Sequence, residues 1–450
     1  MTTSATTREP GAKLRPADII LFWFPLAATW LMMGLELPYV AAIVARMPQA
    51  AYSLAAFGVA TSLAWLIESP IMMLLSAATA LVRDRASYLA LRRFTFILNG
   101  VVTLGMMLLA VPPVFRFVGE TLMGLPVEIS EMARASTFIL VFWPAAIGYR
   151  RFYQGILVRH HMTRRVAYGT AIRLVTMSLT GALLLFTTEL PGAILGALTL
   201  LAGVLAEAVA SRWMARNIVR ALMESDQVAE GTLLTLPAIS RFYFPLALTS
   251  IIAMAMGPLV TFGLAHGRAP IESLAVWPVL QSMVFLFRSG GIAFQEVGIA
   301  LSGAHREHER EVRSTGMMLA GAASFALALV AFTPLEAVWF QRVSGLSERL
   351  ADFAVWPVRL MILVPALDFM LSIQRSRWII DHRTSMVTAA TTVEAVALAA
   401  TLLIMVGGLD VLGAVGGAAA MLAGRLAANG FLLVQSWREE KRNPRGPVAL

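Results

Sequence analysis

"LFWFPLAAT" at residues 21–29 returns almost unchanged as "RFYFPLALT" at residues 241–249. Six of the nine positions are identical, and they include a proline, which is uncommon inside an apolar helix. A short apolar phrase can recur by chance in an apolar chain. Whether the chain is duplicated therefore depends on whether residues outside the phrase also match at the same shift of about 220 positions.

The same register holds across several further segments and the loops between them. Matching residues at a shift of 220 or 221 positions are Pro38 with Pro258, 53–55 with 273–275, Ser69 with Ser289, Pro144 with Pro365, His161 with His382, and Thr163 with Thr384. The constant shift and the shared prolines indicate that the chain consists of two copies of one structural unit.

The composition is typical of a membrane protein. Of the 450 residues, 58% are hydrophobic and 14% are charged, whereas an ordinary soluble domain carries about 25% charged residues. Long apolar segments recur along the whole chain, each near the ~20 residues that a helix needs to cross a bilayer. We therefore predict an all-α polytopic membrane protein.

We expect twelve transmembrane helices in two pseudo-symmetric six-helix lobes. The predicted spans are 17–44, 51–82, 92–117, 129–158, 166–188, 191–220, 238–266, 271–302, 311–333, 347–380, 386–406 and 408–437. They define an N-lobe at 1–225, a cytoplasmic linker at 226–237 and a C-lobe at 238–450. Because each half has six spans, the repeats run parallel, and a transporter built this way places its substrate between the halves.

The net charge of +9 comes mainly from arginines that gather in alternate loops. Arg83, Arg159, Arg212 and Arg377 lie in one set of loops, whereas the other set is short, acidic or mixed. The positive-inside rule places the arginine-rich loops, and with them both termini, in the cytoplasm. We expect a monomeric, multi-pass protein of a bacterial-type inner membrane. It should not bind nucleic acid, because the arginines lie in short loops between hydrophobic spans, where they set the orientation of the chain in the membrane.

The sequence lacks the residues or motifs that several kinds of chemistry require. The chain has no cysteine, which excludes disulfides and thiolate metal sites. It has neither a G-x-x-x-x-G-K-[ST] phosphate loop nor an H-E-x-x-H zinc motif. We therefore expect no enzyme activity, no cofactor and no metal centre. A membrane-embedded transferase or hydrolase is the alternative.

Ionisable groups at membrane depth usually face a cavity or one another, so they are candidate functional residues. Glu36 lies two residues before Pro38 in the first span. We expect helix bends at Pro38 and Pro258, because proline removes a helix hydrogen bond. Met256 stands where Glu36 would be repeated, which suits a proton or cation site in one lobe. The alternative is that Glu36 lies near the outer interface, where it snorkels or pairs.

Glu68 in the second span corresponds to Arg288 in the eighth. One hypothesis is that these two residues face each other across a central cleft and pair in one access state, as a switching contact. The alternative is that each residue pairs within its own lobe, for instance Arg288 with Glu296.

Further cations lie toward the cytoplasmic side of the spans. Arg150 lies in span four, and Arg173 in span five corresponds to Glu394 in span eleven. Together with Arg375, these residues predict a cationic inner cleft that attracts an anionic or phosphate-bearing substrate. The alternative is that such arginines only snorkel to the cytoplasm.

The two six-span lobes, each opening with a bent span, resemble the multidrug/oligosaccharidyl-lipid/polysaccharide (MOP) exporter superfamily with its MATE-like fold. Within it, "FYFPLAL" at 242–248, "GILVRH" at 155–160 and Pro70 are most similar to the progressive ankylosis (ANK) transporter family. The resemblance implies a V-shaped pair of lobes, alternating access and export of anions such as pyrophosphate, nucleotides or citrate. This chain departs from the family in being much richer in alanine and arginine.

We therefore expect a secondary active transporter that exports a small anionic solute across the inner membrane. Glu36 and Glu68 are expected to gate transport or to couple it to H⁺ or Na⁺. The residues expected to bind substrate are Arg150, Arg173, Arg288 and Glu394. One alternative is a cation-coupled multidrug antiporter of the MATE type, with Glu36 as proton acceptor, and another is a lipid-linked saccharide flippase.

Overall fold

The computed structural model describes residues 14–44, 46–123, 125–224, 235–303, 307–344 and 346–442. Within these ranges the chain is helical, and one isolated β-bridge joins Arg268 to Leu412. Most of the predicted linker, 226–237, lies outside the described residues.

The helices of the two halves follow a common order, except that α12 covers the positions of both α2 and α3, and α18 those of both α9 and α10. The first half contains α1 (Pro16–Val44), α2 (Ala50–Glu68), α3 (Leu74–Leu81), α4 (Arg85–Ala110), α5 (Pro112–Arg116), α6 (Val127–Ile139), α7 (Trp143–Arg159), α8 (Thr163–Thr187), α9 (Gly192–Met214) and α10 (Arg216–Glu224). The second half contains α11 (Leu236–His266), α12 (Pro270–Leu301), α13 (Glu309–Ala331), α14 (Leu335–Ala337), α15 (Glu348–Leu360), α16 (Val364–Ile380), α17 (Thr384–Leu402) and α18 (Gly413–Arg442). Short 3-10 segments link neighbouring helices at η1 (Ser69–Ile71), η3 (Leu140–Phe142) and η5 (Met361–Leu363), and short π-helical segments occur at η2 (Phe117–Leu122), η4 (Val338–Val343) and η6 (Leu403–Gly408).

Eleven stretches of the described residues are long and apolar enough to cross a membrane. The remaining predicted span, 129–158, corresponds to α6, η3 and α7, whose counterpart α15–η5–α16 is among the eleven. The first-half segment is less apolar because it carries Arg150 and Arg151 side by side, together with charged residues in α6.

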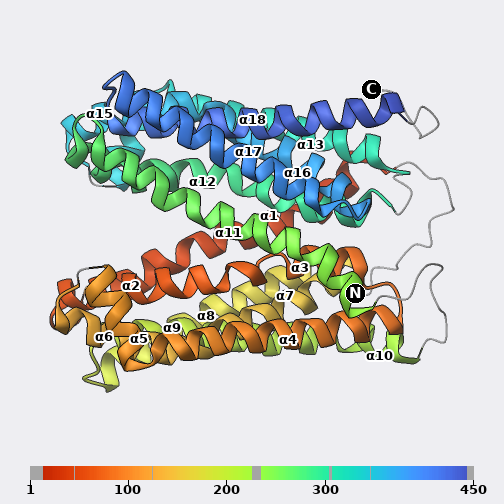
Figure 1. Ribbon diagram of the computed structural model, residues 1–450, viewed down its shortest axis with the longest axis horizontal. Coiled ribbons are helices and arrows are strands. Elements are labelled where there is room, and N and C mark those ends of the chain that lie inside the picture. The colour runs from red at the N-terminus through yellow and green to blue at the C-terminus, as the bar shows by residue number, and fades with distance from the viewer. Residues whose placement is uncertain are drawn as a thin grey trace.

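The helices gather in two bundles, with α1 to α10 in the N-lobe and α11 to α18 in the C-lobe (Figure 1). The segment η3 before Pro144 recurs as η5 before Pro365. The predicted all-α membrane fold with two pseudo-symmetric six-helix lobes is therefore confirmed. One difference lies at Pro70, where the missing amide hydrogen interrupts α2, whereas α12 continues through Gly290 at the matching position.

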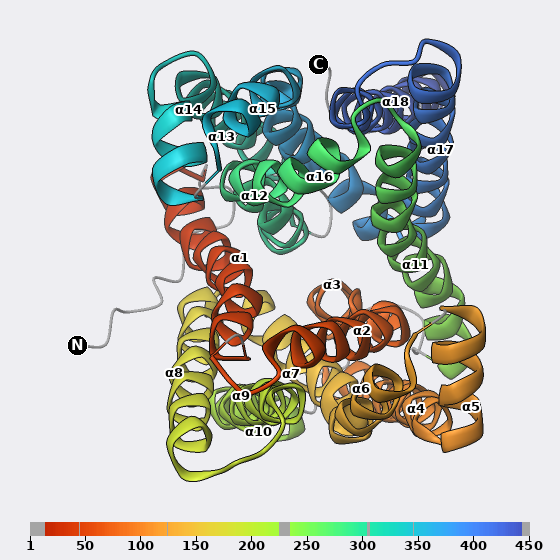
Figure 2. The ribbon, with the colours of Figure 1, turned by 90° about the vertical axis from the view of Figure 1, so that its left-hand side faces the viewer.

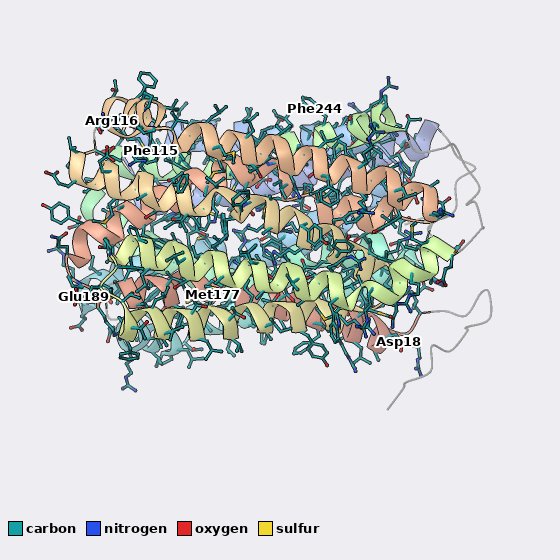
Figure 3. The ribbon with its side chains drawn as sticks, turned by 90° about the horizontal axis from the view of Figure 1, so that it is seen from below. Asp18, Phe115, Arg116, Met177, Glu189 and Phe244 are labelled. Atoms are coloured by element: carbon teal, nitrogen blue, oxygen red, sulfur yellow. The ribbon has the colours of Figure 1, made fainter. Side chains whose placement is uncertain are left out.

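The two ends of the molecule are distinguished by residues labelled in Figure 3. Asp18, in the first turn of α1, lies at one end, and Arg116 and Glu189 lie at the other. The last helix, α18, runs back to the end where α1 begins (Figure 1). We call the end with Asp18 the terminal end and the opposite one the distal end.

The first helix of each lobe reaches toward the other lobe (Figure 2). α1 packs against α8 of its own lobe and against α12 and α13 of the C-lobe, while α11 packs against α17 and against η1 and α4 of the N-lobe. The repeated phrase, at 21–29 and 241–249, therefore lies on the two helices that join the lobes. Pro38 and Pro258 lie inside these helices, and the bends at both prolines stay a prediction.

The repeated phrase makes the same ring contact in both lobes. Phe22 meets the ring of His161 with centroids 5.5 Å apart, and Phe242 meets His382 with centroids 5.4 Å apart. Both histidines have φ of 58°, the left-handed conformation that commonly ends a helix. Burial lowers the pKa of both imidazoles below the usual value. The two rings are therefore neutral at pH 7, which suits their packing against phenylalanine.

The threonine at the end of the phrase also behaves alike in both copies. Thr29 Oγ1 donates a hydrogen bond to the carbonyl oxygen of Pro25 at 2.9 Å, and Thr249 Oγ1 donates to that of Pro245 at 2.9 Å. Both bonds run back by one helical turn, as threonine hydroxyls commonly do. The duplication is thus visible in the contacts of single side chains.

Within the N-lobe, α7 approaches α3 closely at Gly155. A Cβ atom at this position would lie 2.6 Å from the Leu75 carbonyl oxygen and 3.1 Å from the Thr79 amide nitrogen. Both are backbone atoms, so the two helices would have to move apart. Gly58 in α2, by contrast, has nothing within 4 Å of the corresponding point.

We predict that Gly155→Ala lowers the free energy of unfolding by about 1–3 kcal/mol, as overpacking does. Gly58→Ala should leave it unchanged or raise it by up to about 1 kcal/mol, because alanine favours helix more than glycine does. Thermal unfolding of the purified variants in detergent measures the difference. Equal melting temperatures would contradict the close approach of α7 to α3.

Candidate functional site

The N-lobe holds a cluster of buried charges contributed by five of its helices. We call it the N-lobe cluster, and its members are Glu36 on α1, Glu68 on α2, Arg150 and Arg151 on α7, Arg173 on α8 and Glu207 on α9. It contains three carboxylates and three guanidinium groups, so its formal charges balance.

Glu207 lies at the centre of the N-lobe cluster and is fully buried. Its oxygens accept hydrogen bonds from Arg150 Nη1 at 2.7 Å, Gln154 Nε2 at 2.9 Å and Thr170 Oγ1 at 3.0 Å. Arg173 Nη1 lies 3.5 Å from the same carboxylate. A buried carboxylate needs this many donors because its hydration is lost.

The two acids expected to couple transport to an ion both belong to the N-lobe cluster. Glu36 accepts a hydrogen bond from Arg173 Nη2 through one oxygen, Oε2. Within the described part of the chain, Glu36 Oε1 and Glu68 Oε2 are buried and lack a hydrogen-bond partner. Each acid therefore keeps one oxygen free to bind a proton or a cation.

The C-lobe holds a second cluster, built from Arg288 on α12, Asp368 and Arg375 on α16, Glu394 on α17 and Arg425 on α18. Asp368 lies between two arginines, with Arg288 Nε at 2.7 Å and Arg425 Nε at 2.9 Å. Arg425 Nη1 also lies 2.8 Å from Glu394, which has Arg375 Nη2 at 3.6 Å on its other oxygen. This C-lobe cluster has three guanidinium groups and two carboxylates, which leaves one formal positive charge.

The two clusters occupy matching places in the repeat with exchanged charges. Arg173 on α8 and Glu394 on α17 stand at equivalent positions, 221 residues apart. Likewise, Arg375 on α16 stands where Gln154 stands on α7. The same helical scaffold therefore surrounds a central acid with cationic neighbours in both lobes, although the acid comes from a different helix in each.

In this structure Arg288 bonds to Asp368 of its own lobe and not to Glu68, so an ion pair across the cleft in another access state stays a prediction. The alternative of pairing within a lobe is correct for Arg288, but the suggested partner is wrong, since Glu296 instead accepts a bond from Ser76. Arg173 and Glu394, which correspond in the repeat, each pair inside their own lobe.

Three members of the clusters were not predicted from the sequence to be site residues: Glu207, Asp368 and Arg425. The signal was present, because Glu207 and Arg425 are each a single charge within a long apolar stretch of α9 and α18, and such charges are expected to pair. Repeated glycines at 203 and 424 keep the shift of 221 residues in these helices. That register places Glu207 and Arg425 within one turn of equivalent depth.

The two clusters differ in which groups remain accessible. In the N-lobe cluster the paired side chains of Arg150, Arg173, Glu36 and Glu207 expose at most 6% of their surface. In the C-lobe cluster the arginine side chains expose 13–17%, whereas Asp368 and Glu394 expose 4% each. The exposed surface of the C-lobe cluster therefore belongs mainly to its arginine side chains. The described residues include no group of three metal-ligating side chains.

No protein-family model matches this sequence, and no curated protein matches it. Solved structures do match along nearly the whole chain. An outward-facing multidrug resistance MATE transporter of the MOP superfamily superposes with a TM-score of 0.76 at 15% identity, covering 95% of this chain and 96% of that one. The fold is that of the MATE transporters. The Vibrio cholerae MATE transporter VcmN gives a TM-score of 0.75 at 14% identity, covering 95% of this chain and 97% of that one.

A third MATE-like structure is a MOP superfamily transporter from Pyrococcus furiosus. It gives a TM-score of 0.74 at 15% identity and covers 95% of this chain and 96% of that one. Its description reports a reversed polarity of the binding pocket that suggests a different function. The resemblance to the MOP superfamily is thus confirmed at the level of the fold, while the nearer placement with the ANK family stays a prediction.

We predict that Glu207→Gln lowers the free energy of unfolding by about 3–5 kcal/mol, because it leaves buried arginines uncompensated while keeping the side-chain shape. Glu131→Gln is the matched control. Glu131 pairs with Arg116 and Arg134 near the surface, where such pairs contribute about 1 kcal/mol or less. Thermal unfolding in detergent compares the two variants, and a loss for Glu207→Gln no larger than the control's would contradict the central role of Glu207.

Proposed function

We propose that the protein is a secondary active transporter that exports a small anionic solute by alternating access of its two lobes. The observation that carries this proposal is the C-lobe cluster, in which the arginine side chains are partly exposed and their carboxylate partners are buried. An anion that reaches Arg288, Arg375 and Arg425 meets a formal excess of positive charge. Guanidinium forks also match the oxygens of carboxylates and phosphates in geometry.

This proposal changes the roles expected for two arginines. Arg150 is bonded to Glu207, and Arg173 is bonded to Glu36 and lies near Glu207. Their charges are already balanced inside the N-lobe, so we assign them to holding that cluster together rather than to the substrate. Arg288 keeps its proposed role, with Arg375 and Arg425 as additional substrate ligands and Glu394 as the acid that positions Arg425.

Ion coupling is assigned to the N-lobe. Glu36 and Glu68 each present a buried oxygen without a partner among the described residues, and a proton or Na⁺ would satisfy it. We further propose that the terminal end faces the cytoplasm, because the arginine-rich loops lie there. The protein would then act as a monomer in an inner membrane.

Cation-coupled drug antiport is the second candidate. The unpartnered oxygens of Glu36 and Glu68 favour it, because a carboxylate that binds either a proton or an organic cation exchanges one for the other. The neighbours described as MATE transporters support the same reading. The reversed pocket polarity described for the Pyrococcus furiosus protein gives a precedent within this fold for a pocket of the other charge.

The two candidates predict different cargo in proteoliposomes. We expect uptake of radiolabelled citrate or pyrophosphate under an imposed proton or sodium gradient, and no accumulation of the cationic dye ethidium. Arg288→Gln should lower the anion flux by at least about tenfold, because a charge-assisted hydrogen bond to substrate contributes about 1.5–3 kcal/mol. Arg349→Gln is the control, since Arg349 pairs with Glu272 on an exposed surface.

Accumulation of ethidium without anion flux would overturn the anion proposal and favour drug antiport. Each variant is first checked by size-exclusion chromatography, so that loss of flux is not confused with loss of folding. An equal loss of flux in Arg288→Gln and Arg349→Gln would contradict a binding role for the C-lobe cluster.

A further inference from the structure

The lobes are joined by two hydrogen bonds that are copies of each other. Trp23 Nε1 donates to the carbonyl oxygen of Gly290 at 2.8 Å, and Tyr243 OH donates to that of Pro70 at 2.5 Å. Trp23 and Tyr243 are 220 residues apart, and so are Pro70 and Gly290. Each bond therefore repeats the other, with donor and acceptor coming from exchanged lobes.

Between these bonds lies a contact on the pseudo-twofold axis itself. Ser76 Oγ donates to Glu296 Oε1 at 2.6 Å and accepts from Gln295 Nε2 at 2.9 Å. Ser76 and Glu296 are again 220 residues apart. Equivalent positions can touch each other only where the axis passes between them, so this pair marks the centre of the contact.

The outer bonds are held in place by close packing. A Cβ atom at Gly290 would lie 2.7 Å from the Trp23 ring, so the indole approaches the α12 backbone where only a glycine leaves room. Trp23 also lies beside Phe369, with ring centroids 6.1 Å apart, and Tyr243 meets Phe94 edge-on at 5.1 Å. Each donor thus packs against an aromatic ring in addition to forming its hydrogen bond.

All of these contacts lie toward the terminal end. Trp23 and Tyr243 are each the eighth residue of α1 and α11, Ser76 lies at the start of the short α3 that ends at Leu81, and Glu296 lies five residues before the end of α12. Across the described ranges, every hydrogen bond between the lobes belongs to this group. The lobes are therefore fastened at the terminal end.

The contact is also suited to being broken. Two of its bonds join a neutral donor to a backbone carbonyl, and no arginine–carboxylate pair of the described residues crosses between the lobes. Glu296 is the one carboxylic acid among the bonded side chains. Arg151 of the N-lobe cluster acts electrostatically on both Glu68 and Glu296, so separating the lobes at this point changes the surroundings of Arg151.

We propose that Trp23, Pro70, Ser76, Tyr243, Gly290 and Glu296 form a two-fold gate that closes the path between the lobes at the terminal end. Both outer bonds and the axial contact open together when the transporter admits substrate from that side. The proposal rests on alternating access as the proposed function and adds the residues that control one of its two openings. It also gives the repeated phrase a role, since the gate donors are its third residues.

The gate can be tested without any transport measurement, because the chain has no native cysteine. Ser76→Cys places a single thiol at the axis, at a position that is 2% exposed, and serves as the reporter in every sample. The rate of its reaction with a water-soluble maleimide in proteoliposomes reports how often the gate opens. Trp23→Phe and Tyr243→Phe remove the donors and keep the rings.

We expect each of these two variants to speed labelling by a similar factor, about fivefold, which is the loss of one ordinary hydrogen bond. The double variant should multiply the factors to about 25-fold, because both bonds break in the same opening. Gly290→Ala should speed labelling as well, since its methyl group displaces the indole. Trp213→Phe and Tyr168→Phe are the controls, because both side chains are about 60% exposed, and they should leave the rate unchanged.

Unchanged labelling in Trp23→Phe and Tyr243→Phe would overturn the gate, and so would an effect of only one of them. Failure of the proposed transport function is a separate result, namely absence of flux in the proteoliposome assay while the labelling rates still respond as expected. The gate and the function can thus fail independently.

Discussion

Charge buried away from water must be neutralised locally, and this constraint organises both lobes. Removing one partner from a buried ion pair costs several kcal/mol, because the remaining charge has neither water nor a counter-ion. Glu207 gathers donors from α7 and α8, and Asp368 joins α12, α16 and α18. Each lobe is thereby bound internally by contacts that cannot be given up one at a time. Disrupting a lobe would therefore cost more free energy than breaking the hydrogen bonds between the lobes.

The repeated aromatic triplet shows how one short phrase serves two different packing needs. Successive helical residues point about 100° apart, so residues 22–24 and 242–244 face three directions. The first of each triplet packs on a histidine of its own lobe, and the second bonds to the opposite lobe. The third is exposed by 65% or 70%, and Phe244 lies at the outer surface in Figure 3. α1 and α11 consequently belong to both lobes at once.

The sequence predicted the repeat, the all-α fold and the two lobes, because hydropathy and register act over tens of residues and tolerate local error. It did not predict the partners of the buried charges. A shared register places Glu68 and Arg288 at equal depth, but depth does not say around which side of a helix a group points. Arg288 pairs with Asp368 instead, and the spacing of residues within α12 or α16 does not predict that these two side chains lie close together. Glu207 and Arg425 could have been recognised as candidate site residues, since each is the single charged residue in an apolar stretch.

The axial contact between Ser76 and Glu296 has a consequence for how such a fold can be encoded. If two identical half-length chains assembled as a homodimer, the residue on the axis would face its own copy. Two glutamates would then repel each other, and two serines would leave the axis without an ionisable group. Joining the halves in one polypeptide removes that restriction, because the two sides can diverge. The single chain can therefore place an acceptor opposite a donor at the one point where symmetry would otherwise forbid it.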